Sequence, residues 1–77
     1  MKYARADYDR IQDPAGLIPD DEPVFLLRGQ DRNAAAAVRV WAKLVEDEGG
    51  APEIVAAARD HADRMDAWPK KKTPDLN

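Results

Sequence analysis

Two segments in the second half of the chain place apolar residues three or four positions apart, which is the spacing of one face of an α-helix. In the first segment these positions are Ala34, Ala37, Val38, Trp41, Leu44 and Val45. In the second segment the stripe runs through Ile54, Val55, Ala58, His61, Ala62, Met65 and Trp68. The pattern predicts two amphipathic helices, over residues 32–48 and 52–68.

Residues that favour helix ends flank both segments. Asp31 or Asn33 can cap the first helix by accepting a backbone N–H, and Gly49-Gly50 ends it because glycine adopts the left-handed conformation without strain. Pro52 suits the first position of the second helix, and Pro69 ends that helix. The connection is short, so the helices are expected to be antiparallel neighbours.

The first half of the chain has a different pattern. Asp13-Pro14-Ala15-Gly16 has the residue preferences of a type I turn. Residues 24–28 are rich in β-branched and aromatic side chains, which favours a short extended segment, with Tyr8 to Gln12 as a candidate partner in a hairpin. The expected fold class is therefore α-dominated α+β: an N-terminal extended segment or hairpin packed on an antiparallel helical pair.

The expected organisation is a frayed N-terminus over residues 1–10, one small domain over 11–69, and a disordered basic tail over 70–77. A lone core seldom stabilises so short a chain by more than about 3–5 kcal/mol. We therefore expect a second copy or a target protein to complete the core, and the sequence predicts a homo-oligomer. Five large side chains are candidate core or interface anchors: Phe25, Trp41, Leu44, Met65 and Trp68.

Composition narrows the chemistry. The 77 residues include no cysteine and no serine, and Thr73 is the only threonine. A thiolate zinc site is excluded, and catalysis by a hydroxyl or thiol nucleophile is almost excluded, so we expect no enzyme, cofactor or metal. No apolar stretch approaches the roughly 20 residues of a membrane span, and the start lacks the apolar core of a secretory signal. The expected location is the cytoplasm.

Acidic residues exceed basic ones by 15 to 12, and many lie in two clusters without an intervening base. The first cluster holds Asp13, Asp20, Asp21 and Glu22, and the second holds Glu46, Asp47, Glu48 and Glu53. The second cluster sits at a helix C-terminus, where carbonyl groups already make the end negative. One interpretation is an acidic patch that engages a basic protein surface; the other is a solvated turn neutralised by a nearby arginine.

Three further features have two interpretations each. Arg28 and Gln30 are candidate contact residues at the junction before the first helix, although Gly29 and Asp31 there also suit a plain turn and cap. The single histidine, His61, is expected to be a packing or partly exposed side chain, since Asp60 beside it points about 100° away. Lys70 to Lys72 favour a solubilising tail over a nucleic-acid tether, because three lysines neutralise only about three phosphates.

The chain resembles a group of small phage and prophage proteins. The resemblance rests on Arg10-Ile11-Gln12-Asp13-Pro14, on the run from Asp21 to Asp31, on His61-Ala62-Asp63-Arg64-Met65 and on Trp68-Pro69, and it covers residues 8–76. Many small acidic phage accessory proteins are anti-CRISPR inhibitors, which act as stoichiometric binders.

The resemblance therefore implies a non-enzymatic inhibitor of a host protein complex in the host bacterial cytoplasm. The expected target is a CRISPR–Cas effector, bound through acidic surface. Two alternatives stay open, a phage structural or assembly protein and a nucleic-acid-binding regulator, although direct nucleic-acid binding is not expected.

Overall fold

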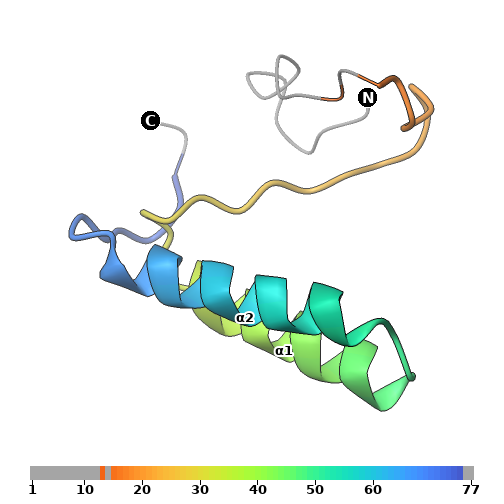
Figure 1. Cartoon of the computed structure of the whole chain (residues 1–77). Coiled ribbons are helices and arrows are strands. Elements are labelled where there is room, and N and C mark those ends of the chain that lie inside the picture. Colours follow the sequence, from red (N-terminus) through yellow and green to blue (C-terminus); the bar gives the residue numbers. More distant parts are fainter. Residues whose placement is uncertain (1–12, 14, 76–77) are drawn as a thin grey trace.

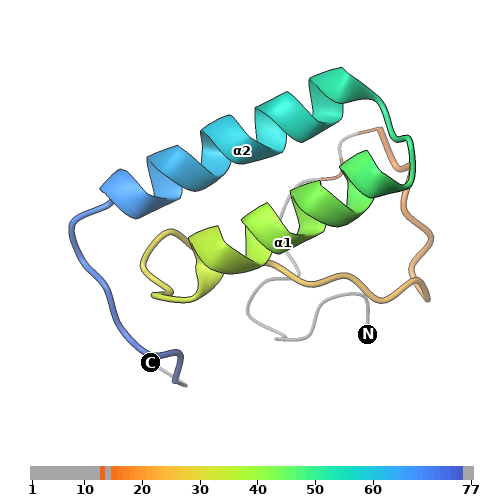
Figure 2. The same ribbon diagram turned by 90° about the horizontal axis from the view of Figure 1, so that it is seen from below.

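The computed structural model describes residue 13 and residues 15–75, and its helices form an antiparallel hairpin (Figures 1 and 2). Helix α1 spans Ala34–Asp47 and helix α2 spans Pro52–Ala67. Both predicted helices are present, with ends that differ by at most two residues from the expected ranges. We call the connection between them the turn end of the hairpin, and the opposite end, where α1 begins and α2 finishes, the open end.

The start of α1 is shaped by Asp31 rather than by a capping side chain at Asn33. Asn33 occupies the cap position but makes no side-chain capping bond. The Asp31 carboxylate instead accepts a hydrogen bond from the Asn33 backbone N–H at 2.8 Å, and its carbonyl accepts one from Ala34 N–H at 3.0 Å. Asp31 therefore orders the turn that leads into the helix.

The hairpin turn depends on two adjacent glycines. Gly49 has a φ of 77°, in the left-handed region that favours glycine. Gly50 donates its N–H to the Val45 carbonyl at 2.8 Å. A Cβ at position 50 would overlap Val45 Cγ1 and lie 3.0 Å from the Val45 carbonyl oxygen. Because the turn packs this closely against α1, there is no room for a side chain at position 50.

The two helices meet along a seam of small residues. The residues fully buried in the described part of the chain are Ala34, Ala35, Ala42, Val55 and Ala62. With half-buried neighbours they continue the three–four spacing of a coiled-coil seam, as Ala35, Val38, Ala42 and Val45 on α1 and Val55, Ala58, Ala62 and Met65 on α2. These positions lie at equal sequence distances on either side of Gly50, as an antiparallel pair requires. Alanine at the contact lets the helix backbones approach closely.

The α+β fold class is wrong, because the described residues contain two helices and no strand or sheet. Residues 24–28, predicted to be extended and strand-like, belong to no strand. A strand is stabilised by a neighbouring strand and by burial of one face, whereas Phe25 is 74% exposed. The candidate hairpin partner, Tyr8 to Gln12, and the N-terminus expected to fray lie outside the described residues.

The residues after α2 return to the start of α1. Asp31 and Lys72 form an isolated parallel β-bridge, in which Lys72 N–H donates to the Gln30 carbonyl at 2.8 Å and Arg32 N–H donates to the Lys72 carbonyl at 3.1 Å. The Lys71 ammonium donates to the carbonyls of Gly29 and Met65. The backbone of Lys72 and the side chain of Lys71 thus fasten the open end.

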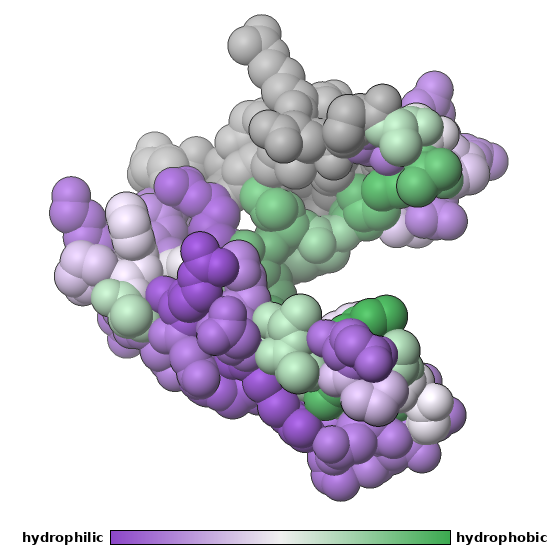
Figure 3. All heavy atoms as spheres, viewed as in Figure 1, coloured by the Kyte–Doolittle hydropathy of each residue, from purple (hydrophilic) through white to green (hydrophobic). Residues whose placement is uncertain are grey.

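The segment before α1 begins with the predicted turn at Asp13. Gly16 N–H donates to the Asp13 carbonyl at 2.9 Å, and the Asp13 carboxylate accepts from the N–H groups of Leu17 and Ile18. Residues 17–28, which we call the arm, then run along the hairpin from its turn end to its open end (Figures 1 and 2). An open gap flanked by apolar residues separates part of the arm from the helices (Figure 3).

Candidate functional site

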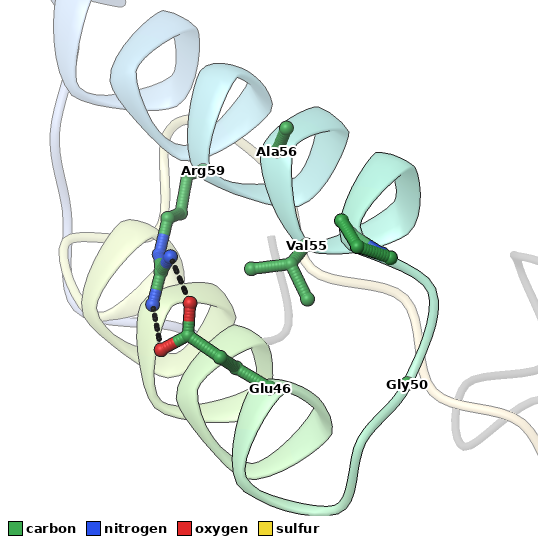
Figure 4. Close-up of a pocket in the computed structure, with 6 residues that line it drawn as sticks. Glu46, Gly50, Val55, Ala56 and Arg59 are labelled. Atoms are coloured by element: carbon green, nitrogen blue, oxygen red, sulfur yellow. Dashed lines mark hydrogen bonds and ion pairs between the residues drawn. The ribbon is translucent and has the colours of Figure 1, made fainter.

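One face of the hairpin is held by ion pairs between the helices. Arg39 on α1 contacts Asp63 at 2.9 Å and Asp66 at 2.7 Å on α2. Arg59 on α2 donates two hydrogen bonds to the Glu46 carboxylate, at 3.0 and 3.3 Å (Figure 4). We call this side the ion-paired face. All of these groups are solvent-exposed, so they fix the register of the two helices more than they stabilise the fold.

The same contacts shift the protonation of the paired groups. Hydrogen bonds from Arg59 hold the pKa of the Glu46 carboxyl below its usual value, and the bond to Glu46 raises the pKa of Arg59. Hydrogen bonds to Asp63 and Asp66 likewise raise the pKa of Arg39. These groups are therefore committed to one another in their charged forms at neutral pH.

The acidic helix end divides into engaged and unengaged residues. Glu46 is held by Arg59, and Asp47 accepts a hydrogen bond from Lys43 at 2.8 Å. The interpretation of a turn neutralised by a nearby arginine therefore fits Glu46. Glu48 is exposed and forms no ion pair in the part of the chain that the structure describes, and neither does Glu53. These two remain candidates for contact with another molecule.

The fold places the two acidic clusters of the sequence toward the same end of the molecule. Residues 15–22, which carry Asp20, Asp21 and Glu22, lie on the same side as the hairpin turn in both views, but Figure 1 shows them apart from the turn, across an open gap (Figures 1 and 2). Asp21 and Glu22 are exposed and, among the described residues, have no ion-pair partner. We call Asp21, Glu22, Glu48 and Glu53 the acidic end. Sequence spacing gives no sign that the clusters lie toward the same end, because more than twenty positions separate them.

The other predicted contact residues lie elsewhere. Arg28 is exposed, and Gln30 is half-buried with its carbonyl engaged by Lys72. Both belong to the open end, so the structure does not bring them together with the acidic residues. Gly29 there sits close to α2: a Cβ added to it would lie 3.4 Å from Trp68 Cβ. This junction fits the plain structural interpretation of a turn packed against the end of α2.

A shallow cavity of about 370 Å³ lies on the ion-paired face near the turn. It is lined by Glu46, Gly50, Pro52, Val55, Ala56 and Arg59 (Figure 4). Its two charged residues point toward one another and share a two-pronged hydrogen bond. Because each charge already satisfies the other, the cavity offers a ligand mainly apolar carbon.

The opposite face of the hairpin is apolar and only half covered. Four side chains on it, between 49% and 54% exposed, are Trp41, Leu44, Ile54 and Trp68; we call this set the apolar face. Trp41 follows Arg39 by two positions, about 200° around the helix, so it projects from the other side of the seam. Figure 4 shows the arm behind the helices, on the side away from the Arg59–Glu46 pair.

The anchor residues predicted from sequence are therefore not the core of the single chain. Trp41, Leu44 and Trp68 are half-exposed, Phe25 is largely exposed, and Met65 alone is half-buried at the seam. The alternative in which they form an interface stays a prediction. The residues that sequence reasoning missed are Arg39, Asp63 and Asp66, which carry opposite charges on the two predicted helices.

The described residues hold neither a metal-ligand cluster nor a membrane-spanning helix. His61 is exposed on α2, and no group of three or more potential metal ligands occurs within the described ranges. Neither α1 nor α2 is long and apolar enough to cross a bilayer. No protein-family model, curated protein or solved structure matches the chain. The resemblance to small phage proteins thus stays a prediction.

Proposed function

We propose that this chain is a non-enzymatic binding protein that docks its acidic end on a positively charged surface of another protein. The observation that supports the proposal is that Asp21 and Glu22 from the arm lie toward the same end of the molecule as Glu48 and Glu53 from the hairpin, on the other side of the open gap. Four carboxylates without an ion pair in the described structure carry charge that is available to a partner.

Electrostatics gives this arrangement its effect. Like charges gathered at one end of a small molecule create a local negative potential that steers it toward a basic surface and raises the association rate. The neighbouring pairs Glu46–Arg59 and Lys43–Asp47 hold the end of α1 in place. Glu48 and Glu53 are thus presented beside a fixed turn rather than on a free tail.

The resemblance to phage proteins supports a particular class of target. A host complex that holds nucleic acid in a basic channel offers positive charge that complements the acidic end. A CRISPR–Cas effector in the host bacterial cytoplasm is the first complex to test. An inhibitor of this kind competes with nucleic acid for the channel, because both are negatively charged.

The test is competition for labelled duplex DNA on a purified effector complex. Excess protein is expected to displace the DNA, and neutralising the acidic end (D21N/E22Q/E48Q/E53Q) is expected to slow association at least tenfold. Asp60 is an exposed acid on α2 away from the acidic end, and Asp60→Asn serves as the matched control, with less than a twofold effect.

Two results would count against the proposal. If excess protein leaves DNA binding unchanged and recovers no effector subunit in a pull-down, this target is wrong. If Asp60→Asn weakens binding of any captured partner as much as Glu48→Gln does, net charge rather than the acidic end is responsible.

A further inference from the structure

The contact between the two helices leaves most of the large apolar side chains uncovered. The seam is built from alanine and valine, and no side chain larger than valine is fully buried within the described residues. The apolar face, by contrast, carries both tryptophans of the chain. A folded chain that buries its smallest apolar residues and exposes its largest has a second surface to cover.

We propose that the apolar face is covered by the same face of a second copy of this chain, giving a four-helix bundle of two hairpins. This inference goes beyond the proposed function, which concerns the acidic end. It is carried by three observations: the size of the face, the distribution of charge along the hairpin, and the access to the face.

The size of the face suits a dimer. Each half-exposed tryptophan has about 100 Å² left to bury, so the two rings supply roughly a quarter of the about 800 Å² that each partner of a stable interface buries. Leu44 and Ile54 add half of their side chains, and exposed Ala37 and Ala57 lie between them on the same side of the seam. Residues of this kind form the layers between helices in a bundle.

The distribution of charge along the hairpin favours a second copy as the partner and an antiparallel arrangement of the two copies. The turn end carries the acidic end, whereas the open end carries bases that form no ion pair in the described structure: Arg28, Arg32, Arg64 and Lys70. An antiparallel dimer sets the acidic end of each copy beside the basic open end of the other. A parallel dimer sets like charges together, which is unfavourable.

Part of the face is open. Figure 3 shows an open gap between the hairpin and part of the arm, with apolar residues on both sides. Where the arm lies beside the helices, a second hairpin has to move it aside. Among described residues, no ion pair joins the arm to α1 or α2.

The mass of the full chain in solution is the first test. Sedimentation equilibrium of the parent protein at about 100 µM is expected to give twice the 8.6 kDa of one chain. Tryptophan emission provides a second readout, because Trp41 and Trp68 are the only tryptophans and both lie on the apolar face. Emission is expected to shift to longer wavelength on dilution, as the rings become hydrated.

Two matched variants locate the interface. Leu44→Glu places a charge on the apolar face and is expected to weaken dimerisation at least 100-fold. Ala56→Glu introduces the same charge at another exposed position. Ala56 lines the cavity on the ion-paired face, on the other side of the hairpin from the apolar face (Figure 4). Ala56→Glu is expected to leave the dimer intact.

Salt tests the direction. Raising the salt concentration from about 0.1 to 0.5 M screens the charges, so it is expected to weaken an antiparallel dimer and would strengthen a parallel one.

A monomeric parent protein overturns the proposal, whether its tryptophans are hydrated or covered by the chain itself. A mass above two chains also overturns it and favours an assembly protein. Equal dissociation by Ala56→Glu and Leu44→Glu overturns the location.

These outcomes are separable from those of the proposed function. Leu44→Glu leaves Asp21, Glu22, Glu48 and Glu53 unchanged, and the neutralised variant D21N/E22Q/E48Q/E53Q keeps all four residues of the apolar face. Loss of the dimer with retained binding to a basic partner contradicts only the dimer, and the reverse result contradicts only the acidic end.

Discussion

At the scale of single residues, two glycines that look alike in the sequence have different structural roles. Gly50 has no space for a side chain, since an added Cβ would overlap Val45 Cγ1. Gly29 has ordinary clearance, with Trp68 Cβ at 3.4 Å from an added Cβ. The Gly49-Gly50 pair indicates a turn from sequence alone, and the structure adds the two reasons: Gly49 has a positive φ, and Gly50 lacks room for a side chain.

This difference gives a prediction for stability. Gly50→Ala is expected to lower the free energy of unfolding by about 1–3 kcal/mol, because the turn must move away from Val45. Gly29→Ala, the control, is expected to change it by less than about 0.5 kcal/mol. Urea denaturation followed by circular dichroism measures both, and equal effects of the two substitutions would contradict the tight turn.

The Glu46–Arg59 pair gives a prediction for protonation. Because the pKa of Glu46 is lowered from its ordinary value of 4.5, the stability contributed by the pair is present above pH 4.5 and is lost as pH falls through the lower folded-state pKa. NMR titration of the Glu46 carboxyl is expected to show a midpoint below 4.5 that returns upward in Arg59→Gln. Arg64→Gln should leave the midpoint in place, since Arg64 forms no ion pair in the described chain.

At the scale of elements, the helices were predictable and the way they meet was not. Pro52, Gly49-Gly50 and the apolar stripes are local signals, and they place both helices within two residues of their observed ends. The stripe on α1 is wider than one contact, however, and periodicity does not say which edge faces α2. Sequence reasoning placed Trp41 in the core or at an interface, and the observed seam between the helices uses Ala42 one position on.

The strand prediction failed for a related reason. The residues 24–28 have the composition of a strand, but strand formation depends on a partner segment and a buried face, neither of which is a property of the residues themselves. Helices complete their backbone hydrogen bonds internally, so local sequence is sufficient to place them. Elements that depend on distant residues are therefore the ones that the sequence predicts less well.

The seam gives a prediction at this scale. Ala42 is fully buried between the helices, so Ala42→Leu forces the helices apart and is expected to cost about 1–3 kcal/mol of unfolding free energy. Ala36→Leu makes the same substitution at an exposed position of α1 and is expected to have little effect. If Ala42→Leu is as stable as the parent, the helices do not meet along this seam.

At the scale of the whole molecule, acidic and basic groups lie toward opposite ends of the hairpin, and the apolar face lies along its side between them. The sequence showed two acidic clusters and a basic tail, but their positions at opposite ends follow from the reversal at Gly50 and from the return of residues 71–72 to the open end. Candidate site residues could be chosen from sequence by type, as Glu48 and Asp21 were. Their grouping with each other, and their separation from Arg28, required the fold.

The dimer has a consequence for stability that a monomer lacks. When unfolding is coupled to dissociation, mass action makes the melting temperature rise with protein concentration, here by roughly 3–5 °C for each tenfold increase in a two-chain unit of this size. Melting curves of the parent over about 2 to 200 µM should show this rise, whereas Leu44→Glu should melt at one temperature throughout. Trp68→Ala distinguishes a core position from an interface position in the same experiment. If the indole packs only against the second copy, the substitution reduces the concentration dependence of melting and has little effect on the melting temperature of the single chain. A parent protein whose melting temperature ignores concentration would show that the half-exposed tryptophans are covered by something other than another copy of this chain.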